Sequence, residues 1–157
     1  MIIFLEDLEK WKCDYQACEA KCCIEGRELT LQDIKRISAK EKKKKWSDFA
    51  SIDRETMTIR LKGEKGKCIF LKPDFSCKIW LNRPLVCRLL PFKIENISYS
   101  DEPIMRLKPE KFCPGYGKGP KLGQEFKHNI EQAALQLIRE RQELFRKSKE
   151  NLLDEEL

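Results

Sequence analysis

Eight cysteines dominate the chemistry that this sequence can perform. Four lie near the start of the chain, three in its middle and one beyond them: Cys13, Cys18, Cys22 and Cys23, then Cys68, Cys77 and Cys87, then Cys113. Thiolates are soft ligands for zinc and for iron–sulfur clusters, and separate segments contribute them because several ligands must surround one centre. Eight cysteines therefore match two four-thiolate sites, or one four-thiolate cluster with additional thiols.

The spacing of the cysteines differs from the common metal motifs. It is Cys-x4-Cys-x3-Cys-Cys, then Cys-x8-Cys-x9-Cys, with the last cysteine 26 positions after Cys87. No pair has the Cys-x2-Cys spacing of zinc ribbons, and the bacterial ferredoxin spacing is absent. The adjacent pair Cys22 and Cys23 favours two neighbouring metals, or a multinuclear cluster with a free thiol, because neighbouring side chains project in different directions.

Two other roles for the cysteines stay open, as buried apolar residues or as disulfides. We expect a cytoplasmic protein. The apolar run at residues 2–5 is too short for a signal peptide, and no stretch reaches the roughly 20 apolar residues of a membrane span. In a reducing compartment, eight cysteines favour metal or redox chemistry over disulfides.

Charged residues near the cysteines complete the candidate site. Four thiolates on a dication or on a cubane cluster leave a negative centre, which Arg83 and Arg88 could neutralise without binding the metal. The only histidine, His128, lies on the polar flank of a predicted helix, where we expect it to face solvent. The lysine run at 42–45 predicts a solvated helix end, and a nucleic-acid partner is not expected.

Several common catalytic motifs are absent. The sequence has no Gly-x-Gly-x-x-Gly after a strand, no Walker loop and no Gly-x-Ser-x-Gly elbow. With one histidine, a Cys–His hydrolase is not expected either. These absences argue against an ordinary nucleotide-binding or hydrolase fold and leave the cysteines as the centre of the function.

The first half of the chain predicts a mixture of short helices and strands. Cys18 and Cys22 are four residues apart and would share one face of a helix. Thr30, followed by Asp33, resembles the capping box that starts a helix. Apolar periodicity predicts the next two elements, a short helix at 46–52 and a half-buried strand at 55–61.

The second half of the chain predicts a hairpin, a short helix, two strands and a long helix. The hairpin would carry cysteines on both arms, and Pro84 suits the first turn of the short helix. The expected ranges are 68–71 and 75–79 for the hairpin, 85–90 for the short helix, 92–99 and 104–107 for the strands, 113–120 for an irregular loop and 122–149 for the long helix.

These elements predict one α+β domain over residues 1–157, with a core at about 10–120. The expected metal centre lies between the N-terminal cysteine block, a short antiparallel sheet and the long C-terminal helix. A chain of this length buries roughly 68–70% of its unfolded surface, so it does not need metal or disulfides merely to fold.

Residues 77–92 read Cys-Lys-Ile-Trp-Leu-Asn-Arg-Pro-Leu-Val-Cys-Arg-Leu-Leu-Pro-Phe. They resemble the pattern Cys-x-Ile-Tyr-x-x-Arg-Pro-x-x-Cys-Arg-x-Tyr-Pro-Phe of the CxxCxxCC family. These cysteine-cluster proteins are named for a proposed zinc- or iron-chelating domain and include flagellin lysine N-methylase. Similar segments begin at Leu29, Cys68 and Cys113, so the resemblance spans about residues 10–120. The first cysteine block is stretched relative to the family, and we expect Cys13 to matter least for metal binding.

The resemblance implies a metal centre, with all eight cysteines as candidate ligands. The methylase relatives favour an iron–sulfur cluster, of the 4Fe-4S type, over zinc. Three functions stay open: a metal-binding protein with a redox, sensing or accessory role; an iron–sulfur-dependent protein lysine N-methylase-like enzyme; and a structural zinc module that docks a protein partner. Only the methylase alternative requires S-adenosylmethionine, and there Arg83 and Arg88 would hold an anionic cosubstrate.

Overall fold

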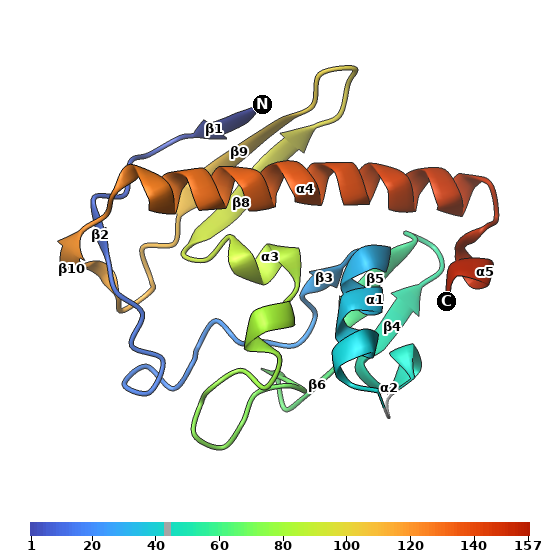
Figure 1. The fold of residues 1–157 in the computed structure, drawn as a ribbon, viewed down its shortest axis with the longest axis horizontal. Helices are drawn as coiled ribbons and strands as arrows, with labels where there is room; N and C mark the ends of the chain where they lie inside the picture. Colours follow the sequence, from blue (N-terminus) through green and yellow to red (C-terminus); the bar gives the residue numbers. More distant parts are fainter. Residues whose placement is uncertain (43–44) are drawn as a thin grey trace.

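Two small sheets and one long helix organise the chain (Figure 1). The structure is a computed structural model, and it describes residues 1–42 and 45–157. The helix α4, Gln124–Lys149, runs past both sheets and contributes side chains to two hydrophobic cores. The architecture is α+β, as the sequence predicted.

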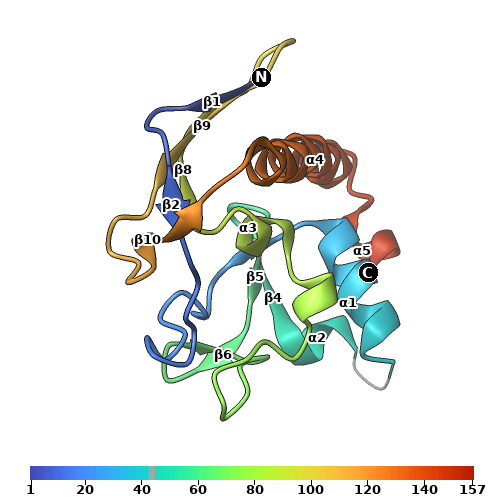
Figure 2. The ribbon, with the colours of Figure 1, turned by 60° about the vertical axis from the view of Figure 1, so that its left-hand side comes forward.

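The first sheet has the strand order β1-β9-β8. It consists of β1 (Ile2–Phe4), β9 (Ile104–Pro109) and β8 (Phe92–Ser98). β1 is parallel to β9, and β8 is antiparallel to it. Exposure alternates along β9, so that Met105 and Leu107 are buried against Ile130 and Leu137 of α4. Figure 2, which looks nearly along α4, shows the helix lying beside this sheet.

The second sheet has the order β3-β5-β4 and carries the other core. It is formed by β3 (Glu28–Leu29), β5 (Thr58–Leu61) and β4 (Ala50–Asp53), next to the helices α1 (Leu31–Lys40) and α2 (Trp46–Phe49). Leu144 of α4 and Leu153 of the last helix, α5 (Leu153–Glu156), join this core. The apolar faces of α1 and of this sheet thus contribute to one shared core, which α4 and α5 help to cover.

The cysteines lie on or beside short elements outside the two three-stranded sheets. Two of these elements are paired ribbons: β2 (Lys10–Trp11) with β10 (Tyr116–Lys121), and β6 (Gly63–Glu64) with β7 (Lys67–Cys68). The 3-10 turn η1 (Trp80–Asn82) and the helix α3 (Leu85–Arg88) follow. In both ribbon views, the N-terminal loop, the β6 hairpin and the loop before η1 gather below the rest of the molecule.

Several local predictions are confirmed. Thr30 caps α1, and its hydroxyl accepts a hydrogen bond from the Asp33 N–H while the Asp33 carboxylate accepts one from the Thr30 N–H. Pro84 immediately precedes α3, and the strands β8 and β9 occupy the expected ranges. His128 is exposed on α4. The prediction for the lysine run at 42–45 falls partly on residues 43 and 44, which lie outside the described residues.

Residues 13–26 form turns, so Cys18 and Cys22 do not share a helix face, and the backbones of Glu19 and Ala20 have positive φ. Another local prediction is wrong. The predicted hairpin at 68–79 is reduced to β7 and an isolated bridge between Leu71 and Cys77. Phe145 of α4 is 61% exposed, although its neighbour Leu144 is buried in the core of the second sheet.

The remaining differences concern element boundaries. The helix predicted at 46–52 ends at Phe49, and β4 begins directly after it. The strand predicted from residue 55 begins only at Thr58, because Met57 has a positive φ and belongs to a turn. The expected loop at 113–120 contains β10, which pairs with β2. Among the described residues, no helix combines the length and the apolarity that crossing a membrane requires.

Candidate metal centre

Four cysteines from three segments lie near one another where the β6–β7 hairpin meets α3; we call them the inner thiols, and they are Cys23, Cys68, Cys77 and Cys87. The Cys68 N–H donates to the Cys23 carbonyl at 3.1 Å, which joins the first two segments. The isolated bridge to Leu71 brings Cys77 back beside the hairpin. Charges on Cys68 and Cys77 would raise the pKa values of both Cys23 and Cys87, so all four sulfurs share one electrostatic environment.

Burial controls the protonation of three inner thiols, those of Cys68, Cys77 and Cys87. It is the largest cause that raises the pKa of Cys87, to about 12, and it also raises the pKa values of Cys68 and Cys77. Without a metal, these thiols are therefore protonated at neutral pH. A metal must displace their protons, because only thiolates are good ligands.

Backbone amides oppose the effect of burial at two of the inner thiols. The Phe70 N–H donates to the Cys68 sulfur at 3.4 Å, and this bond lowers the pKa of Cys68. A backbone hydrogen bond from Ile79 lowers the pKa of Cys77 in the same way. Each amide lies two residues after its cysteine, so the local turn itself supplies a donor for a thiolate.

Arg27 brings a positive charge to the inner thiols. Its charge lowers the pKa values of both Cys68 and Cys87, against the effect of their burial. Its Nη2 donates to the Cys22 carbonyl at 2.9 Å, while its Nε is buried without a hydrogen-bond partner. A buried, unpaired donor on an arginine whose charge acts on Cys68 and Cys87 is the feature expected where an anionic group binds.

Arg27 is not among the site residues predicted from the sequence. Its only sequence signal is its position, immediately after the glycine that ends the first cysteine block and four residues after Cys23. Arginines are common in such turns, so that position alone does not distinguish it. Its approach to Cys68 and Cys87 depends on contacts between distant segments.

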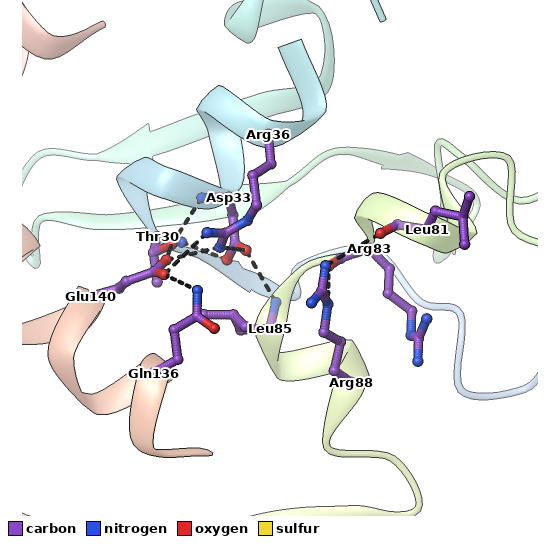
Figure 3. Close-up of polar contacts among 9 residues, drawn as sticks. All are labelled: Thr30, Asp33, Arg36, Leu81, Arg83, Leu85, Arg88, Gln136 and Glu140. Atoms are coloured by element: carbon purple, nitrogen blue, oxygen red, sulfur yellow. Dashed lines mark hydrogen bonds and ion pairs between the residues drawn. The ribbon is translucent and has the colours of Figure 1, made fainter. Parts of the chain in front are cut away.

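The two arginines predicted from the sequence have different surroundings (Figure 3). The guanidinium of Arg83 lies 3.9 Å from the ring centre of Trp80, and its charge acts on Cys77 and Cys87. Burial lowers the pKa of Arg83, and Arg88 adds to this effect. Arg88 instead donates to two backbone carbonyls, of Arg83 at 3.2 Å and of Leu81 at 3.4 Å. Arg83 therefore contributes charge near the thiols, while Arg88 supports the turn that precedes α3.

A buried polar network holds α3 in place (Figure 3). One carboxylate oxygen of Asp33 accepts from the Leu85 N–H at 3.1 Å and from Arg36. Glu140 of α4 accepts from Arg36 and from the Thr30 hydroxyl, at 2.6 Å for the latter. The network thus joins α1, α3 and α4, and α3 carries Cys87.

The other four cysteines lie near the β2–β10 ribbon; we call them the outer thiols, and they are Cys13, Cys18, Cys22 and Cys113. The indole N–H of Trp11 donates to the Cys113 sulfur at 3.4 Å. The pKa of Cys13 is raised, first by partial burial of its thiol and then by Cys22, Cys18 and Cys113. The pKa of Cys22 is lowered to about 6, mainly by a hydrogen bond from the Cys23 thiol.

The donor set fits a thiolate-bound metal centre, although the thiols are not yet arranged around one. All eight cysteines are free. Within residues 1–42 and 45–157, no three cysteine, histidine, aspartate or glutamate side chains are positioned to hold a metal ion. The inner thiols nevertheless combine soft donors, amide N–H groups aimed at sulfur, and the unpaired Nε of Arg27. Metal binding would require the thiols to lose protons and rotate inward.

Comparison with known proteins agrees with this donor set. No curated protein and no solved structure matches the chain. One family model, described as "Putative zinc- or iron-chelating domain", matches residues 12–135. This range contains all eight cysteines and reaches into α4. The chain therefore belongs to the CxxCxxCC family, whose description assigns zinc or iron chelation to it.

Proposed function

We propose that the protein holds a metal centre through its inner thiols and has a redox, sensing or accessory role. The observation that carries the proposal is the meeting of four thiols from three segments next to the charge of Arg27. The amides of Phe70 and Ile79 add donors to two of the sulfurs. Such donors and cations offset the negative charge of a four-thiolate centre and tune its affinity or reduction potential.

A 4Fe-4S cluster is our preferred occupant, with zinc as the alternative. The preference rests on the sequence resemblance to flagellin lysine N-methylase, since the inner thiols suit either group chemically. We also propose a reducing compartment such as the cytoplasm, because the thiols must stay reduced to bind metal. When bound, an iron–sulfur cluster would supply one-electron chemistry. The chain itself would supply the ligands, the amide hydrogen bonds and the charge of Arg27.

Anaerobic purification tests the proposal directly. We expect iron and acid-labile sulfide in the full chain, together with visible absorption. Cys77→Ala and Cys87→Ala should each lose the metal of the inner thiols. Val86→Ala, which shortens a partly buried side chain on the same helix, is the matched control and should keep it. Equal metal content in all three variants would refute the assignment of the inner thiols as ligands.

The two alternative functions give different results in the same preparation. A colourless protein that contains zinc and unfolds when the zinc is chelated supports the structural zinc module, which would dock a protein partner. Transfer of a methyl group from S-adenosylmethionine to a protein lysine supports the methylase-like enzyme.

A further inference from the structure

The β2–β10 ribbon brings two of the outer thiols together from opposite ends of the sequence. Trp11 pairs with Tyr116, and the Lys12 N–H donates to the Gly115 carbonyl at 3.2 Å. A Cβ atom on residue 115 would collide with the Lys12 carbonyl, so glycine is required for this close approach. Cys13 and Cys113 directly flank these backbone contacts.

The loop between Cys13 and Cys23 has a defined hydrogen-bonded conformation. The Cys18 N–H donates to the Asp14 carbonyl at 3.1 Å, and the Ala20 N–H donates to the Tyr15 carbonyl at 2.8 Å. Ala20 is only 1% exposed, and its positive φ reverses the chain. This buried turn brings Cys18 and Cys22 back toward Cys13, although no regular secondary structure connects them.

The outer thiols consequently share one environment, as the inner thiols do. Cys22, Cys18 and Cys113 all act electrostatically on Cys13. Cys22 lies between the two groups, because its sulfur also hydrogen-bonds with that of Cys23. Adjacent residues direct their side chains differently, so one tetrahedral centre does not readily take both members of the pair. The boundary between the outer and the inner thiols therefore falls between Cys22 and Cys23.

We propose that the outer thiols form a second four-thiolate metal site, separate from the inner one. The choice of metal class rests on the proposed function, but the ligand set rests on the ribbon and on the turn at Ala20. Because Cys13 and Cys22 are exposed whereas the inner thiols are all partly buried, the outer site exchanges metal with solvent faster. The protein therefore binds two metal centres with different accessibility.

Cobalt titration of the full chain tests this proposal. Co²⁺ alone is added without oxygen to reduced protein, and thiolate-to-metal charge-transfer absorption is followed to saturation. We expect two equivalents for the wild-type chain. The quadruple variant C13S/C18S/C22S/C113S should bind one equivalent, with the absorption of a tetrahedral thiolate site. Circular dichroism should show that this variant folds, because the four side chains lie outside both hydrophobic cores.

Each result decides between the two sites. Wild-type and variant chains that both bind one equivalent overturn the outer site and leave the inner site standing. One equivalent in the wild type and none in the variant supports the outer site but refutes the proposed inner site. No binding by the wild type overturns both, and two equivalents bound by the variant overturn the outer site.

Alkylation of the wild-type chain gives a second measurement that needs no substitution. Saturating Co²⁺ should protect all four outer thiols from iodoacetamide, as read by peptide mass spectrometry. On dilution into a chelator, the outer thiols should become reactive before the inner thiols. Outer thiols that stay fully reactive at saturating Co²⁺ would overturn the second site.

Discussion

Asp33→Ala should destabilise the protein strongly, because its carboxylate serves two helices. Asp33 is 1% exposed and accepts hydrogen bonds from the backbone N–H groups of Thr30 and Leu85, which are 1% and 0% exposed. The substitution leaves both amides buried without an acceptor. Each orphaned donor costs about 1–3 kcal/mol, so we expect a loss of about 4 kcal/mol in the free energy of unfolding. Arg36 keeps its ion pair with Glu140 and adds little.

Asp48→Ala is the matched control. Asp48 occupies the same third helical position in α2, and its carboxylate accepts from the Lys45 N–H at 2.8 Å. Both residues are exposed, so water replaces the lost bond. We expect a cost of about 1 kcal/mol or less, which is typical of an exposed capping interaction.

Urea denaturation of reduced, chelator-treated protein measures the difference. With an m-value of about 2 kcal/mol/M, Asp33→Ala should lower the midpoint by about 2 M and Asp48→Ala by no more than about 0.5 M. Asp33→Ala should also weaken metal binding by the inner thiols, because α3 positions Cys87. Equal stabilities for the two variants would refute the claim that Asp33 holds α3.

Two further predictions concern charge. Arg27→Gln should lower the metal affinity of the inner thiols by roughly 10- to 100-fold, the usual effect of removing a group that supports metal ligands, while Arg27→Lys should retain most of the affinity. Competition with a chromophoric chelator measures both affinities. Equal affinities for the Arg27→Gln and Arg27→Lys variants would contradict the role of the charge. Burial tends to raise the pKa of Glu140, but hydrogen bonds from Arg36, Thr30 and Gln136 outweigh it and lower the pKa below its ordinary value of 4.5. A carboxyl whose pKa is lower in the folded protein stabilises the fold at pH values above its pKa in the unfolded chain. That stability is lost as the pH falls through its pKa in the folded protein. As the pH falls below about 4.5, the urea midpoint should therefore fall more steeply for the wild type than for Glu140→Gln. The same dependence of the midpoint on pH in both proteins would contradict a stabilising role for the Glu140 carboxylate.

The elements that depend on local chemistry could be predicted from the sequence. The capping pair Thr30 and Asp33 set the start of α1, Pro84 set the start of α3, and apolar spacing located α4 and the strands β8 and β9. These features follow from neighbours within a few residues, so periodicity and capping preferences suffice. Where the chain turns without such signals, as at Glu19 and Ala20, the sequence predicted no defined element.

The grouping of the eight thiols depends on contacts between distant segments and could not be predicted from their spacing. Cys23 and Cys68 meet through a backbone bond, and Cys113 meets the N-terminal segment through Trp11, 102 residues away. Asp33 reaches Leu85 across 52 residues, so its role in supporting α3 could not be found from a capping box. Spacing shows which residues can share a turn. The packing of the sheets and α4 decides which distant turns meet, because burial of apolar surface across the whole chain, and not local preference, fixes their positions.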